Sequence, residues 1–187
     1  MIRQSLMPAA LTLSLAFAAP ARADEISDAL NSALSAYGEG DIKYALEELE
    51  FAKQLLTGLQ VDELAQFLPE PPAGYSREMN SEMGAGLSLM GGGTGAEAEY
   101  SNGDDSFTVT LIADNPMVGA MAGMLSNAAA IGAKIERVGR QKMMVQDGEI
   151  TGLVDNRILV QAQGENTDLM LDVLKTLDFR ALTAFGR

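Results

Sequence analysis

The sequence contains no cysteine, no histidine and no tryptophan among its 187 residues. Without cysteine the chain has no disulfide, no thiol nucleophile and no lipid-modified N-terminal cysteine. Without histidine it lacks the imidazole general base and the usual zinc and iron ligands. The strings G-x-S-x-G and S-x-x-K, which mark serine hydrolases, are also absent. We therefore expect a protein that is not an enzyme and that binds no cofactor.

Basic residues are scarce. Thirteen Lys and Arg face 26 Asp and Glu, which gives a formal net charge of −13. Between residues 24 and 133 the bases are Lys43, Lys53 and Arg77 alone, whereas acid and base balance after Lys134. This excess of acid disfavours nucleic acid and anionic membrane surfaces as partners. Solubility is one explanation of the acidic part, and a basic protein partner is the other.

The N-terminus has the three parts of a secretory signal. Arg3 precedes an apolar run over residues 6–17, and the small-residue site Ala21-Arg22-Ala23 follows. We predict that residues 1–23 form a cleavable signal peptide and that the protein is periplasmic or secreted. The apolar run is too short to span a bilayer, so we expect no stable membrane insertion of the mature chain.

Residues 24–68 have the pattern of a helical hairpin followed by a short third helix. Apolar residues recur at helical spacing over 26–37 and 42–56, and the string GEGD at 38–41 breaks the two runs. Gly58 is expected to end the second helix, and VDELAQFL at 61–68 to form the third. The proline-rich PEPPAG at 69–74 is predicted to be a linker and the domain boundary.

Residues 75–187 predict an α+β domain. A β-hairpin is expected where the alternating runs 96–100 and 107–113 flank Asn102-Gly103. Four strands should follow near 134–138, 141–146, 150–154 and 157–163, and a helix over NTDLMLDVLKTLDF at 166–179. An antiparallel sheet of about six strands with packed helices would bury every apolar face of these elements.

Two stretches resemble known families. ALSAYGEGDIKYALEELEFAKQLL resembles a single tetratricopeptide repeat unit, with Ala36, Gly40, Asp41, Ala45 and Leu49 near the expected places. SFTVTLIAD before a helix, followed by GEITGLVDNRILVQAQG and a terminal helix, resembles the PsbP-like and LpqN-like exported domains over residues 75–182. The second resemblance implies a lumenal or periplasmic accessory or binding domain, and it transfers no catalytic residues.

NPMVGAMAGMLSNAAAIGA, at 115–133, carries no charge. Asn115 suits a helix N-cap and Pro116 the first helical position, which predicts a helix over about 116–127. At about 100° per residue, one face carries three methionines and the roughly opposite face carries small residues. The methionines are Met117, Met121 and Met124, and the small residues are Gly119, Gly123 and Ser126.

Three interpretations of this segment stay open. Membrane insertion is disfavoured because Ala, Gly, Asn and Ser dominate. The three thioethers could bind Cu(I), because soft ligands select that ion. Alternatively, the methionine face packs on the sheet and the glycine face receives a second layer, either the N-terminal hairpin or another chain. In that third interpretation Gly119, Gly123 and Ser126 are partner contacts.

Two polar clusters complete the candidates. KIERVGRQK at 134–142 groups Lys134, Arg137, Arg140 and Lys142, which could bind an anion, with Arg137, Arg140 and Lys142 as its candidate residues, or simply form a solvated edge strand. Asp104 and Asp105 could serve a carboxylate-dependent enzyme or offer oxygens to calcium, although the local spacing is not that of an EF-hand and turn chemistry explains it.

The leading hypothesis is a non-catalytic exported binding or adaptor protein that acts through protein–protein contacts. Its partner would be another envelope protein or a second copy of itself. The alternatives are a Cu(I)-binding protein that uses the three methionines and an enzyme built on carboxylates.

Overall fold

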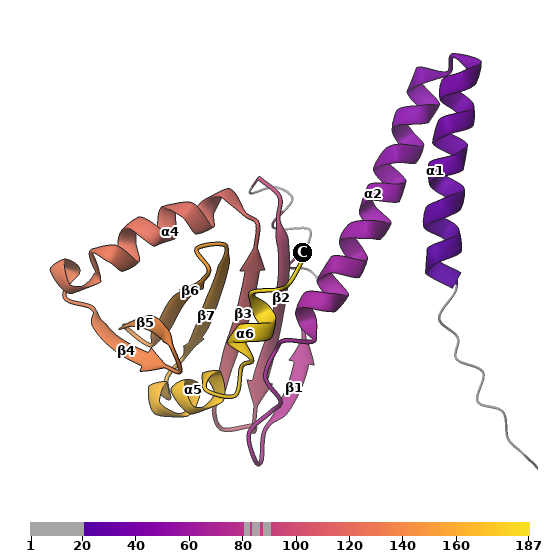
Figure 1. Cartoon of the computed structure of the whole chain (residues 1–187). Coiled ribbons are helices and arrows are strands. Elements are labelled where there is room, and N and C mark those ends of the chain that lie inside the picture. Colours follow the sequence, from indigo (N-terminus) through magenta and orange to yellow (C-terminus); the bar gives the residue numbers. More distant parts are fainter. Residues whose placement is uncertain (1–20, 81–82, 84–86, 88–90) are drawn as a thin grey trace, which may run out of the picture. The chain divides into compact units, whose positions relative to one another are not determined.

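A computed structural model describes residues 21–80, 83, 87 and 91–187, and it divides into two compact units between Leu55 and Leu56 (Figure 1). Most of the predicted signal peptide, residues 1–20, lies outside the described residues. We describe the two units separately.

The first unit is the predicted helical hairpin (Figure 1). Helix α1 spans Ala21–Glu39 and helix α2 begins at Ile42. Gly40 turns the chain with a φ of 84°, and the Asp41 side chain accepts a hydrogen bond from the backbone N of Tyr44 at 3.1 Å. Small side chains separate the helices: the buried residues are Ile26, Ala29, Ala33, Ala36, Ala45 and Ala52. This mostly alanine seam lets the two backbones approach closely.

Helix α2 is longer than expected. It spans Ile42–Ala65 without a break at Gly58, so the predicted third helix at 61–68 is wrong. An interior glycine costs a helix about 1 kcal/mol but does not by itself end it, and good helix formers lie on both sides of Gly58.

The proline-rich segment at 69–74 belongs to the second unit. Leu68 is buried in its core. The carbonyl oxygen of Pro69 accepts hydrogen bonds from the Tyr100 hydroxyl at 2.7 Å and from Nη1 of Arg77 at 2.8 Å. The division between compact units therefore falls inside α2 and not at this segment.

The second unit is built on a seven-stranded antiparallel sheet in the order β1-β2-β3-β7-β6-β5-β4. The strands are β1 (Ser76–Met79), β2 (Thr94–Ser101), β3 (Ser106–Ala113), β4 (Lys134–Val138), β5 (Gln141–Gln146), β6 (Glu149–Val154) and β7 (Ile158–Gly164). The α+β class is confirmed, with one strand more than expected. That strand, β1, has the sequence SREM and is largely exposed at the sheet edge, so it lacks the apolar alternation that reveals a strand.

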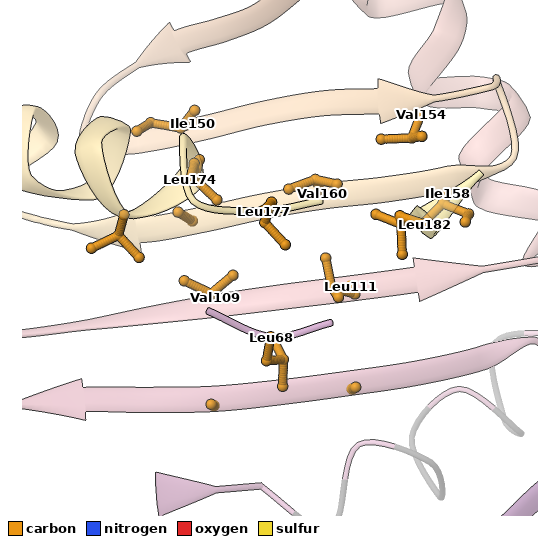
Figure 2. Packing of buried hydrophobic residues seen from close by; sticks show 14 of the residues in the cluster. Leu68, Val109, Leu111, Ile150, Val154, Ile158, Val160, Leu174, Leu177 and Leu182 are labelled. Atoms are coloured by element: carbon orange, nitrogen blue, oxygen red, sulfur yellow. The ribbon is translucent and has the colours of Figure 1, made fainter. Parts of the chain in front are cut away.

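One face of the sheet holds the core. Tyr100 stacks on Phe107 with ring centroids 4.8 Å apart and an interplanar angle of 4°. Helices α5 (Thr167–Leu174) and α6 (Phe179–Leu182) cover this face. Figure 2 shows their region contributing Leu174, Leu177 and Leu182 against strand residues, among them Val109, Leu111 and Val160. The predicted terminal helix is confirmed as α5.

The ionisation of Tyr100 should make the stability of this core depend on pH in the alkaline range. Burial raises the pKa of its fully buried hydroxyl to about 12, whereas the unfolded value is 10.0. The folded state therefore holds the proton more tightly. We expect the free energy of unfolding to fall by about 2–3 kcal/mol as pH rises from 10 to 12. Denaturant unfolding should show a shallower fall for Tyr100→Phe, and equal slopes for the two proteins would contradict the assignment.

Candidate binding sites

The first candidate is an apolar groove along the helical hairpin. We call it the hairpin groove; it is lined by Leu30, Leu34, Tyr37, Ile42, Leu46 and Leu49, with Ala33 and Ala45 at its floor. The side chains at its rim are strongly exposed: 69% for Leu34, 68% for Tyr37 and 62% for Leu46. The alanine seam explains this exposure, because the longer side chains stand outside the narrow helix–helix contact. The apolar stripes were predicted from the sequence, whereas their exposure within the hairpin was not.

No charged residue lines the hairpin groove. At about 100° per residue, Asp24, Asp28 and Glu39 lie on the side of α1 opposite Leu30 and Tyr37. On α2 the bases form local pairs: Lys43 with Glu47 at 3.5 Å, and Lys53 with Glu50 at 3.2 Å. The groove is therefore an uncharged surface within an acidic hairpin.

The second candidate is helix α4 (Pro116–Ser126), which is confirmed with its predicted cap. The backbone N of Met117 donates to Oδ1 of Asn115 at 2.8 Å, and Nδ2 of Asn115 donates to the Gly92 carbonyl. These contacts cap the helix and link its N-terminus to the backbone at Gly92.

The expected packing of the methionine face on the sheet is wrong. Val118 is 3% exposed, whereas Met117 is 50% and Met124 49% exposed. Val118 and Leu125 point in nearly the same direction on the helix, about a quarter turn from the methionines. The inward face is thus the one with the β-branched and leucine side chains, and the methionines lie along its flank.

The glycine face of α4 is open. Gly119, Gly123 and Ser126 are exposed, and a Cβ at either glycine would meet nothing within 4 Å. Within the second unit, no described residue provides the expected second layer. The Ser126 hydroxyl donates to the Ala122 carbonyl at 2.8 Å, inside its own helix. Partner contact at these three residues stays a prediction.

The third candidate lies beneath the C-terminal half of α4, and we call it the α4 cleft. It has a volume of about 550 Å³. Leu125 and Ala128 line it on the helix side, and Ile135 and Leu153 on the sheet side. Leu153 alternates with the core residues Ile150 and Val154. The cleft therefore lies on the face of the sheet opposite α5 and α6.

The predicted anion residues meet at this cleft in part. Arg140 and Lys142 line it. Arg137 is the register partner of Lys142 on the neighbouring strand but is not among the lining residues. The apolar residues of the cleft were missed by sequence analysis, because their nearness depends on how α4 crosses the sheet.

The carboxylates Asp104 and Asp105 lie in a surface turn. The Asn102 side chain accepts hydrogen bonds from their backbone N atoms at 3.0 and 2.8 Å. Asp105 accepts a 2.7 Å hydrogen bond from the Tyr75 hydroxyl, and this bond raises the pKa of Tyr75. Among the residues the structure describes, no group of three or more Asp or Glu side chains is placed to hold a metal ion.

Comparisons with known proteins give no match: no family model, no curated protein and no solved structure matches the chain. The resemblances to PsbP-like and LpqN-like domains and to a tetratricopeptide unit therefore stay predictions. Within the described residues, no helix combines the length and apolar character needed to cross a membrane.

The rotation of α4 predicts a ranking of substitutions. Val118→Ala should lower the free energy of unfolding by at least about 1 kcal/mol, because it removes buried methyl groups. Met124→Ala, at an exposed site, should change it by less than about 0.5 kcal/mol. Urea unfolding measures both changes, and the reverse ranking would show that the methionines face the sheet.

Proposed function

We propose that this protein is a non-catalytic binding protein that acts through protein–protein contacts, that the hairpin groove is its contact surface, and that the groove is occupied by a second copy of the hairpin. The observation that carries the proposal is the row of exposed apolar side chains with no charge among them. Contiguous apolar patches on an otherwise charged surface mark interaction sites. The predicted signal peptide supports a place in the periplasm or outside the cell.

The exposed area suits self-association. The six larger groove side chains are 44–69% exposed, so a second hairpin laid over them would bury apolar surface from both copies at once; stable interfaces bury roughly 1,200–2,000 Å² in all. Two hairpins placed groove to groove around a two-fold axis would form a four-helix bundle, in which the leucines of one copy fill the groove of the other.

The net charge of the chain distinguishes a second copy from a basic partner as the occupant of the groove. The apolar groove would form the dry centre, and the carboxylates of both hairpins would stay at the outer surfaces. Because each chain carries a formal charge of −13, two copies repel at long range. Added salt screens this repulsion and should strengthen a self-contact, whereas it would weaken contact with a basic partner.

Sedimentation velocity over a concentration series tests the contact. The double variant Leu34→Glu with Leu46→Glu should raise the dimer dissociation constant at least about tenfold, because it places charge in the buried centre. The matched control is Asn31→Glu with Gln54→Glu, which adds the same charge on exposed positions away from the groove. Circular dichroism checks that all variants keep their helices.

Three results would overturn self-association through the groove: a wild-type protein that stays monomeric across the series, a groove variant that dimerises like the control, or a contact that weakens as salt rises. The last result, together with binding of a synthetic basic amphipathic helix, would assign the groove to a foreign partner.

A second candidate function, Cu(I) binding, is favoured by the exposure of Met117 and Met124 on one flank of α4, with Met121 partly exposed beside them. Accessible thioethers at this spacing could share one soft ion.

Competition against a Cu(I) chelator tests this candidate. Replacing Met117, Met121 and Met124 by Leu should abolish binding, whereas Met79→Leu, at a methionine exposed on β1, should leave it unchanged. Equal Cu(I) affinity in the triple variant and the wild type would remove copper from consideration.

A further inference from the structure

We infer that the α4 cleft binds a small free amphiphile with an anionic head group, such as a medium-chain carboxylate. This site lies in the second unit and does not depend on the hairpin contact. Three observations carry the inference: the shape of the cleft, its unpaired cations and its apolar walls.

The cleft has the size of a ligand site. Its volume of about 550 Å³ falls within the roughly 300–1,000 Å³ of small-molecule pockets. It is formed by two secondary-structure layers, α4 and the sheet, and not by a single loop. A chain of about eight carbons with a compact head group would fit such a volume.

The two cations of the cleft have no acidic residue beside them in its lining. Three other arginines of the second unit are held by the fold: Arg77 donates to the Leu68 and Pro69 carbonyls, Arg157 pairs with Asp114, and Arg187 pairs with Asp155. The side chains of Arg140 and Lys142, like those of Arg137 and Arg180, make no ion pair or hydrogen bond with any residue that the structure describes. In a chain with twice as many acids as bases, the walls of the cleft thus bring two cations together without a carboxylate.

Apolar side chains form part of the remaining lining, beside the polar Ser126, Gln141 and Asn156, and they favour an amphiphile over a simple anion. Leu125 and Leu153 are partly buried, and Ile135 is 40% exposed beside them. A bare phosphate or sulfate would use the cations and leave these side chains in water. A ligand with an alkyl tail would cover them as well, and burial of alkyl groups is favourable.

The polarity of α4 sets the orientation of the ligand. The C-terminal end of the helix, which lies at the cleft, carries a partial negative charge of roughly half an elementary unit. The anionic head should therefore lie at Arg140 and Lys142, and the tail should lie below Leu125. Helix α4 carries no charged residue, so it places no carboxylate in the cleft that would compete with the ligand for the two cations.

Calorimetric titration of the full chain with octanoate tests the inference. The expected result is saturable binding that weakens at least tenfold in Arg140→Ala with Lys142→Ala. The matched control, Lys175→Ala with Arg180→Ala, removes the same charge elsewhere and should bind as the wild type does. The groove variant Leu34→Glu with Leu46→Glu should also bind normally, which excludes the hairpin as the site.

The choice of ligand separates the sources of binding energy. Butyrate, inorganic phosphate and octyltrimethylammonium should each bind at least tenfold more weakly than octanoate. Absence of saturable octanoate binding, equal binding of phosphate or of the cation, or an unchanged Arg140 and Lys142 variant would each overturn the inference. Binding to phosphatidylglycerol vesicles without binding to monomeric octanoate would also overturn it, because the source would then be a membrane.

Discussion

The second unit depends on burying one face of its sheet, because a chain without cysteine has no covalent cross-link to hold a fold together. Tyr100, Phe107 and Leu111 lie on that face, each at most 2% exposed. A fully buried side chain of this kind contributes about 1.5–3 kcal/mol. The same alternation sends a polar row to the other face, where Thr110 donates to Glu97 and Gln161 donates to Glu149, both at 2.7 Å. One face therefore stabilises the unit, and the other is free to carry a cleft.

The hairpin, in contrast, leaves most of its large apolar side chains exposed. Its two helices meet through alanines, so little apolar area is buried between them, and the larger side chains are left at the surface. A two-helix hairpin cannot cover both of its apolar stripes alone, and adding two more helices is the simplest way to do so. The proposed self-contact would cover these exposed leucines, among which no charged residue lies.

Sequence patterns predicted the parts of this structure that depend on local spacing. The alternation around Asn102-Gly103, the cap at Asn115, and the helical runs on either side of Gly40 all led to elements that the structure confirms. Strand β1 was missed because the sequence SREM shows no apolar alternation and the strand is held only by pairing with β2. Gly58 was wrongly expected to end the second helix. The cost of one glycine in a helix is small compared with the stabilisation from the long helical run around it.

The candidate sites were harder to predict than the fold. The Met117, Met121 and Met124 face was identified from spacing alone, but its direction depends on how Asn115 is anchored and on which side chains best fill the space above the sheet. Arg140 and Lys142 were found as a cluster, whereas Leu125 and Leu153 join them only through the crossing of α4 over β6. Local patterns therefore located residues of chemical interest, and tertiary packing decided which of them face one another.

The account rests on a self-contact through the hairpin groove, and cysteine scanning tests it most directly because the chain has no cysteine of its own. Single variants Leu34→Cys and Leu46→Cys would be treated with a short thiol-reactive cross-linker in dilute solution, beside Asn31→Cys and Gln54→Cys. The account predicts covalent dimers from the two groove positions and almost none from the two outer positions. Equal cross-linking at all four positions, or none at any, would contradict it.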